Sequence, residues 1–271
     1  MNYERELKFA LLAAQKAAEY INSDISEIAV EKYKGSSKDF ATEHDIAVDQ
    51  IISYILKTEY PDDIILTEET VDNFQYNPEK RVWIIDPIDG TRNFANGLSH
   101  YSISIALWEK GDIVLGVIHA PKLNEVYYAT KGQGAFFQEK PLTTSLKESE
   151  LESSLVLTGF SYFQGEELDQ MLSFAKKVLS ASTDILRLGS ASLDTATVTL
   201  GKAGAYYEKG VKIWDIAAAF IISKEAGINI SDFAGNELDI SNPSNYKIES
   251  FLATKNDSIK SHMIKLLSNE N

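Results

Sequence analysis

The chain of 271 residues is 44% apolar and 24% charged, a balance typical of a globular protein that buries a large core. Its 26 Lys and Arg against 40 Asp and Glu give a formal net charge of −14, which disfavours nucleic-acid binding. It has no cysteine, which excludes disulfides, thiolate zinc sites and a cysteine nucleophile. No segment resembles a signal peptide or reaches the roughly 18 apolar residues of a membrane span, so we expect a cytoplasmic protein.

Helical periodicity dominates the first sixty residues. Apolar residues at spacings of three and four predict an amphipathic helix within residues 1–21. Residues 31–39 break that pattern, and the Lys34–Lys38 stretch predicts a mobile surface loop. The helical period returns over residues 45–56, and Pro61 closes this second predicted helix.

The middle of the chain is rich in predicted strands. Two short buried strands are predicted at 64–66 and 82–85. Three more, at 101–108, 113–119 and 125–129, are separated by turn residues and predict an antiparallel meander. The Lys131–Gly134 segment lacks the third glycine and following helix of a dinucleotide-binding motif, so we interpret it as a hairpin turn.

Strands and helices alternate in the last third. Helices are predicted at 168–179, 192–200 and 216–226, the last ended by Gly227, with a strand at 205–208. No repeat, low-complexity tract or linker divides the chain. We therefore predict a single domain over residues 1–271 with two lobes, approximately 1–145 and 146–271.

A turn that follows the predicted strand at 82–85 carries the most chemistry. Pro87 restricts the backbone between Asp86 and Asp89, so both carboxylates can converge. Gly90 allows close approach to a ligand, and Thr91 can begin a helix whose N–H groups would face a phosphate. The alternative is an ordinary tight turn, because Pro, Asp and Gly are common turn formers.

Three further acidic features, a pair of glutamates and two single aspartates, favour the chemical interpretation, although each has a structural alternative. Glu68 and Glu69 end a predicted strand, where a solvated loop would explain them equally well. Asp215 precedes an apolar helix and is a natural N-cap. Asp45 lies near the start of the second helix, where an acid complements the helix dipole.

Together these residues supply oxygen ligands at several strand and helix ends. The four histidines, His44, His100, His119 and His262, show no ligand spacing, and we assign them structural or surface roles, although His44 could touch the site beside Asp45. Such a set favours Mg²⁺, with Mn²⁺ as a possible substitute. Two such ions about 3.5–4 Å apart can hold the attacking and leaving oxygens of a phosphoryl transfer.

The segment from Asp86 to Phe94 (Asp-Pro-Ile-Asp-Gly-Thr-Arg-Asn-Phe) resembles the first signature of the inositol monophosphatase family. The stretch from Trp214 to Gly227 resembles the second signature of this family. Three shorter segments also occur in the order typical of the family: Thr67–Glu69, Gly189–Ala191 and Tyr206–Glu208. The resemblance implies a layered αβαβα fold of the α+β class, a homodimer, and Mg²⁺-dependent, Li⁺-sensitive hydrolysis of a small-molecule phosphate ester with two or three ions.

The resemblance also implies roles for individual residues. Two metal sites are implied, the first formed by Glu68, Asp86 and the carbonyl of Ile88, and the second by Asp86, Asp89 and Asp215. Glu68 and Thr91 would position the attacking water, with Asp45 accepting the Thr91 hydroxyl. The N–H groups of Gly90 and Thr91 would bind phosphate, and Ala191 and Glu208 would face the alcohol of the substrate.

Three departures from the family pattern concern positions outside the implied ligands. Thr67 and Ile228 stand where glycine is common, and Gly204 stands where aspartate is frequent. The substrate therefore stays open between a polyol phosphate, foremost inositol monophosphate, and a 3′(2′),5′-bisphosphate nucleotide or fructose 1,6-bisphosphate. Asn93 favours the inositol phosphate pattern. A regulatory binding role with little catalysis, as in some bacterial members tied to transcription, is a further alternative.

Overall fold

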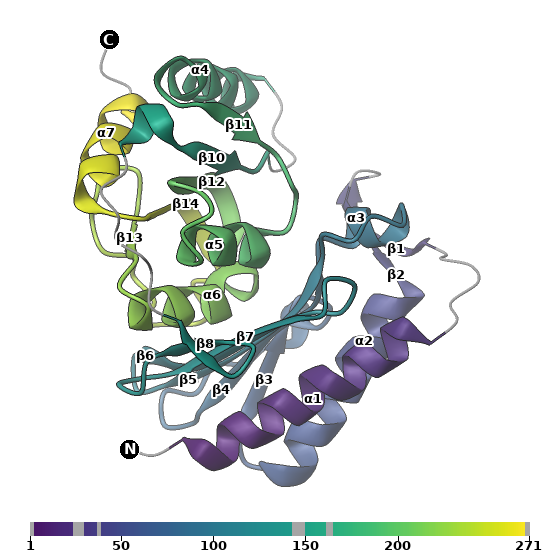
Figure 1. Cartoon of the computed structure of the whole chain (residues 1–271). Coiled ribbons are helices and arrows are strands. Elements are labelled where there is room, and N and C mark those ends of the chain that lie inside the picture. Colours follow the sequence, from purple (N-terminus) through teal and green to yellow (C-terminus); the bar gives the residue numbers. More distant parts are fainter. Residues whose placement is uncertain (1–2, 24–29, 37–38, 143–149, 161–164, 269–271) are drawn as a thin grey trace.

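The structure is a computed structural model that describes residues 3–23, 30–36, 39–142, 150–160 and 165–268. It forms five layers, in the order helices, sheet, helices, sheet, helices (Figure 1). This arrangement is the layered αβαβα fold of the α+β class expected from the resemblance. No helix in the described ranges is long and apolar enough to cross a membrane.

The outer layer on one side consists of α1 (Glu4–Asn22) and α2 (Glu43–Glu59). The buried face of α1 is mostly alanine, which lets this helix pack closely against α2 and the neighbouring sheet. Both helices confirm the predicted periodicity. The mobile loop predicted at Lys34–Lys38 is wrong for residues 34–36, because they belong to β1 (Val30–Ser36), which pairs antiparallel with β2 (Asp39–Thr42). Residues 37 and 38 lie outside the described residues.

The second layer is a seven-stranded sheet in the order β3-β4-β5-β6-β7-β8-β9. Only the β3–β4 pair of this sheet is parallel, and β4 to β9 pair antiparallel. Within this series, β5, β6 and β7 confirm the predicted antiparallel meander. The strands are β3 (Ile64–Thr67), β4 (Val82–Asp89), β5 (Ser102–Glu109), β6 (Asp112–Ala120), β7 (Glu125–Thr130), β8 (Ala135–Phe137) and β9 (Lys140–Leu142). The turn between β7 and β8 contains the predicted hairpin residues 131–134.

The middle layer is formed by α5 (Ala191–Thr199) and α6 (Ile213–Glu225), which share one apolar core with strands of both sheets. Helix α6 is apolar on nearly all sides because it is covered by a sheet on each face. It ends where predicted, with Gly227 following at a φ of 85°. Gly116 of β6 has no side chain, so α6 lies directly against that strand.

The fourth layer is a five-stranded sheet in the order β11-β10-β12-β14-β13. Its strands are β10 (Leu155–Thr158), β11 (Asp184–Leu186), β12 (Ala205–Lys212), β13 (Asn229–Ser231) and β14 (Lys247–Thr254). Helices α4 (Glu166–Ala181) and α7 (Asp257–Leu267) cover its outer face. Two single-turn 3₁₀ helices, Val71–Asn73 and Leu151–Ser153, and the short helix α3 (Thr91–Ala95) complete the fold. The predicted division near residue 145 lies outside the described residues and stays a prediction.

Candidate active site

The first site carboxylates belong to the end of β4, which is longer than the sequence predicted. The strand continues through Asp86 to Asp89, and its pairing with β5 is irregular between these two residues. That irregularity accommodates Pro87, which cannot donate to a regular ladder. Both carboxylates are buried, Asp86 with 2% and Asp89 with 7% of its surface exposed, and the Ile88 N–H donates to Asp86 Oδ1 at 3.1 Å.

Gly90 turns the chain from β4 into α3. Its φ of 97° lies in the left-handed region that favours glycine. A Cβ at this position would lie 3.1 Å from the carbonyl oxygen of His100 and 3.2 Å from that of Gly189. The main chain of the turn is therefore in close contact with two other segments, one of them from the second half of the sequence.

Asp89 is held by the segment that begins α5. Its Oδ2 accepts hydrogen bonds from Ser190 Oγ at 2.6 Å, Ser192 N at 2.8 Å and Ser192 Oγ at 2.5 Å. Within the described residues, its Oδ1 accepts a single hydrogen bond, from the Ala191 N–H at 3.2 Å. A carboxylate oxygen has about two acceptor positions, so Oδ1 keeps capacity for a cation while Oδ2 is saturated.

Asp215 is the third residue of α6, and the prediction that it is the N-cap is wrong. Lys212 occupies the N-cap position, and its N–H donates to Asp215 Oδ2 at 2.7 Å. An acidic residue at this position reaches back to the N-cap N–H, as in one half of a capping box. The carboxylate is thereby fixed in direction at the start of a buried helix.

Asp45 occupies the same position in α2. Its Oδ2 accepts the Thr42 N–H at 2.7 Å and the Thr42 hydroxyl at 2.5 Å, which completes a capping box. Its Oδ1 faces the hydroxyl of Thr91, which donates at 3.1 Å. The carbonyl of Ile88 is a second acceptor for that hydroxyl, at 3.0 Å. The contact expected between Thr91 and Asp45 is thus present, and its effect on water stays a prediction.

The electrostatics connect carboxylates from four elements. Burial raises the pKa of Asp215 well above its usual value, and the negative charges of Asp89, Glu68 and Glu208 raise it further. Burial also raises the pKa of Asp89, although hydrogen bonds from the two serines oppose the change. Glu68 directly follows β3, and its N–H donates to the carbonyl of Ile85 on β4 at 3.3 Å. The site therefore concentrates negative charge that a cation would neutralise.

The donor chemistry suits a hard divalent cation, since the expected ligands are all oxygens. The carboxylates do not yet surround an ion position. In the described part of the chain, no three Asp, Glu or His side chains lie close enough together to hold a metal ion. The free capacity of Asp89 Oδ1 and the repulsion around Asp215 nevertheless fit cation binding. The ligand assignment of Glu68, Asp86, Ile88, Asp89 and Asp215 remains a prediction.

The two residues expected to face the alcohol lie on different elements. Ala191 begins α5, and its N–H points to Asp89. Glu208, on β12, accepts the hydroxyl of Tyr206 at 2.5 Å. Its carboxyl group occupies the space beside Gly159, because a Cβ there would come within 1.7 Å of Glu208 Oε2. Only a glycine fits at position 159 with Glu208 in this orientation.

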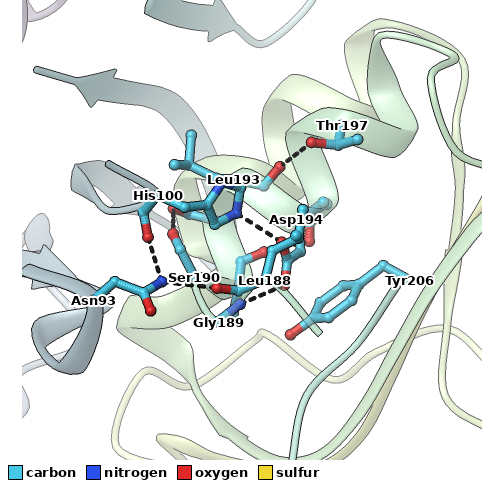
Figure 2. Close-up of polar contacts among 12 residues, drawn as sticks. Asn93, His100, Leu188, Gly189, Ser190, Leu193, Asp194, Thr197 and Tyr206 are labelled. Atoms are coloured by element: carbon cyan, nitrogen blue, oxygen red, sulfur yellow. Dashed lines mark hydrogen bonds and ion pairs between the residues drawn. The ribbon is translucent and has the colours of Figure 1, made fainter. Parts of the chain in front are cut away.

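Sequence reasoning missed the side chains that hold these groups in place. Ser190 and Ser192 bind Asp89. His100 and Asp194 pair with each other (Figure 2). A run of small polar residues before a helix was a signal for helix capping, but not for a distant partner. His44 is buried, and its Nδ1 lies 3.1 Å from the Tyr20 hydroxyl oxygen. Its ring packs edge-on against Phe94.

Comparisons with known proteins agree over nearly the whole chain. A model of the inositol monophosphatase family matches residues 2–270. Nus factor SuhB of Haemophilus influenzae is 36% identical over 232 residues, which cover 85% of this chain and 86% of that protein. An IMPase from Thermotoga maritima has 34% identity and a TM-score of 0.85, with 97% and 96% of the two chains covered. An inositol monophosphatase from Anabaena has 28% identity and a TM-score of 0.80, with 98% and 96% covered.

Proposed function

Because this chain belongs to the inositol monophosphatase family, a family of metal-dependent phosphatases, we propose that it is a Mg²⁺-dependent phosphomonoesterase acting on a small polyol phosphate. Inositol monophosphate is the first candidate substrate. The observation that carries the proposal is that three other carboxylates lie near Asp215 and repel its negative charge: Asp89, Glu68 and Glu208. Mutually repelling carboxylates at the ends of buried elements destabilise a fold unless a cation neutralises them.

The proposed ligands fall into two groups. Glu68, Asp86 and the Ile88 carbonyl would hold one ion, and Asp86, Asp89 and Asp215 would hold another, with Mn²⁺ as a possible substitute. A bound divalent ion lowers the pKa of water and stabilises charge on a transferring phosphoryl group. A third ion is compatible with the proposal, because phosphate oxygens of the substrate would supply ligands of their own.

The chain's own groups orient the reactants. Thr91 donates its hydroxyl proton to Asp45, which leaves the oxygen lone pairs of Thr91 to accept a hydrogen bond from the attacking water. Glu68 would hold the same water from the other side. The N–H groups of Gly90 and Thr91 would bind phosphate oxygens, where glycine permits close approach. Ala191 and Glu208 would contact the alcohol part of the ester.

Two substrate alternatives share this metal chemistry. A 3′(2′),5′-bisphosphate nucleotide or fructose 1,6-bisphosphate would place a different alcohol against Glu208 and Ala191. Glu208 is half-buried and carries a negative charge, which suits hydroxyl donors and repels a second phosphate group. That charge favours a monophosphate of a polyol over either bisphosphate.

The relative named Nus factor SuhB favours a second candidate function, a regulatory role as a protein partner. The two chains are 36% identical over most of their length, which supports considering this role. The net charge of −14 favours a protein partner over a nucleic acid. Both roles can coexist in one chain. A homodimer, Li⁺ inhibition and a cytoplasmic location complete the proposal.

A phosphate-release assay tests the proposal. The purified protein is incubated with Mg²⁺ and inositol monophosphate, fructose 1,6-bisphosphate, adenosine 3′,5′-bisphosphate or histidinol phosphate, with a chelator control for each substrate. We expect Mg²⁺-dependent release that is fastest with inositol monophosphate. Release from none of the four, in protein that is folded and metal-loaded, would overturn the enzymatic proposal and favour the binding role.

A further inference from the structure

Three chain segments meet beside Asp89, and one side chain ties them together. Asn93, in the first turn of α3, is buried, and its amide Nδ2 donates to the carbonyl of His100 at 2.6 Å and to that of Leu188 at 2.7 Å (Figure 2). Asn93 therefore connects the turn after β4 to the segment before β5 and to the segment before α5. Both Gly90 and Gly189 have positive φ angles at this junction.

A half-buried histidine and a buried carboxylate pair behind that junction. His100 Nε2 lies 2.9 Å from Asp194 Oδ1, and Asp194, in the first turn of α5, is 1% exposed. The second carboxylate oxygen of Asp194 accepts the Gly189 N–H at 3.4 Å. The backbone adds a further link, because the Asp194 N–H donates to the carbonyl of Ser190 at 2.8 Å. Asp194 thus contacts Gly189 and Ser190, the first two residues of the turn that supplies the donors to Asp89.

Packing alone does not require a carboxylate at position 194. Its charge is nearly removed from water and lies close enough to Asp89 to raise the pKa of that group. A neutral side chain of the same shape would avoid this repulsion. The charge is therefore explained best by its partner, since His100 supplies the hydrogen bond that a buried carboxylate needs.

We propose that His100 and Asp194 are a positioning pair that fixes the Gly189–Ser192 turn and thereby the direction in which Asp89 presents its Oδ1. Three donors from the turn engage Oδ2 and leave Oδ1 with a single long contact. A rotation of the turn would redistribute these donors over both oxygens. Neither residue is itself a proposed ligand, and the pair would act through the turn that holds Asp89. This inference rests on the proposed function for its link to a metal.

Two substitutions at position 100 separate positioning from packing. His100→Phe keeps a planar ring but removes the donor to Asp194, whereas His100→Gln keeps a donor close to the place of Nε2. Mutation of a group that orients a metal ligand typically costs about 10–100-fold in metal affinity. We expect His100→Phe to weaken Mn²⁺ binding about tenfold or more, and His100→Gln to restore most of this loss. His262→Gln, at an exposed histidine on α7, is the matched control.

The readouts do not depend on one another. Mn²⁺ binding is measured by calorimetric titration without substrate, and kinetics then give kcat, KM and the Mg²⁺ concentration for half-maximal activity. We expect His100→Phe to raise that Mg²⁺ concentration while KM at saturating Mg²⁺ changes about twofold or less. Asp194→Asn, which keeps shape but presents an NH₂ group or a neutral oxygen to Gly189, should weaken Mn²⁺ binding in the same direction. It replaces His100→Phe if that variant fails to fold.

Unchanged Mn²⁺ affinity in both His100→Phe and Asp194→Asn would overturn the inference and make the pair a structural contact only. Equal losses in His100→Phe and His100→Gln would also overturn it, because a donor at position 100 would then be irrelevant. Failure of the proposed function gives a different result. Wild-type protein would then bind Mn²⁺ yet release no phosphate, and the calorimetric comparison would still decide the role of the pair.

Discussion

Asp89 shows how one side chain reconciles burial with charge. Its carboxylate lies among other acids, where burial raises its pKa, yet three donors from one short turn stabilise the ionised form at Oδ2. The remaining oxygen is available on the other side. The two carboxylate oxygens of Asp89 are chemically identical but differ in their surroundings, since Oδ2 accepts three hydrogen bonds and Oδ1 accepts one.

Replacement of Asp89 by asparagine would remove that asymmetry. If the amide oxygen takes the place of Oδ2, the NH₂ group replaces Oδ1 and cannot bind a cation; in the opposite orientation the NH₂ group faces the Ser192 N–H. We expect Asp89→Asn to lose more turnover than the roughly 10–100-fold typical of an indirect ligand contact, with the fold retained. Turnover and thermal unfolding are measured together, with Asp62→Asn, an exposed carboxylate, as control. Near-normal turnover at unsaturating Mg²⁺ would remove Asp89 from the metal site.

Thr91 and Asp45 form one relay in our proposal, so their effects should not add. Thr91→Ala and Asp45→Asn should each reduce turnover strongly, and the double variant should be little worse than either. Thr91→Ser should retain far more turnover than Thr91→Ala because it keeps the hydroxyl. Asp45→Asn also weakens the capping box of α2, at a cost of about 0.5–2 kcal/mol, which denaturant unfolding will report separately. Losses that multiply as independent effects would contradict the relay.

Glu208 is expected to select substrates by their hydroxyl groups. Hydrogen bonds to charged groups contribute roughly 1.5–3 kcal/mol, so Glu208→Gln should raise KM for inositol monophosphate about tenfold or more. An aryl phosphate has no hydroxyls to lose and should be affected much less. The two KM values are compared in the same preparation, with Glu237→Gln, an exposed loop residue, as control. Equal changes on both substrates would mean that Glu208 is structural.

At the scale of the elements, local sequence patterns predicted most of the fold. Both N-terminal helices, the meander and the end of α6 at Gly227 depend on periodicity and turn residues close together in the chain. The loop predicted at Lys34–Lys38 was wrong for residues 34–36, because a polar segment that contains a glycine can also pair as a short strand. Asp215 was assigned to the N-cap because its sequence context resembles one, whereas helix α6 starts two residues earlier.

The candidate site was predicted unevenly for a related reason. Motif residues such as Asp86 and Thr91 follow one another in the chain and were found directly. The donors to Asp89 come from a segment 101 to 103 residues away, and no local pattern links Ser190 or Ser192 to it. The His100–Asp194 contact spans 94 residues and was invisible for the same reason. Local sequence patterns thus pointed to the proposed chemical groups but not to the distant side chains that hold them in place.

The packing of α6 on the seven-stranded sheet depends on the absence of one side chain. A Cβ at position 116 would lie 2.6 Å from both the Ala218 carbonyl oxygen and Ile221 Cγ2. Gly116→Ala should therefore destabilise the fold by about 1–3 kcal/mol, since the helix must move away from β6. Asp215 begins the same helix, so Mg²⁺ activation should weaken in parallel. Urea unfolding and an Mg²⁺ titration check both effects; an alanine variant as stable as wild type would contradict this packing.

At the scale of the whole molecule, divalent cations should act as stabilising ligands. The chain carries a net charge of −14, and a cation that binds only the folded state stabilises it by about 2.7 kcal/mol at a concentration 100 times its Kd. For a chain of this size, that corresponds to a rise in Tm of roughly 5–10 °C. Thermal unfolding is compared in MgCl₂ and in NaCl of equal ionic strength. The rise should disappear in Asp89→Asn; an equal rise with NaCl would indicate general screening.

The hydrogen bonds that complete the site also determine when it can form. Asp89 meets Ser190 across 101 residues, and Asn93 meets the carbonyl of Leu188 across 95. Contacts this far apart in sequence close large loops and form late in folding. At synthesis rates of about 5–20 residues per second, roughly 5–20 s pass between the appearance of the first partner and that of the second. During that interval the β4 carboxylates have no partner segment, so the nascent first sheet must keep this edge open to water until the rest of the chain arrives.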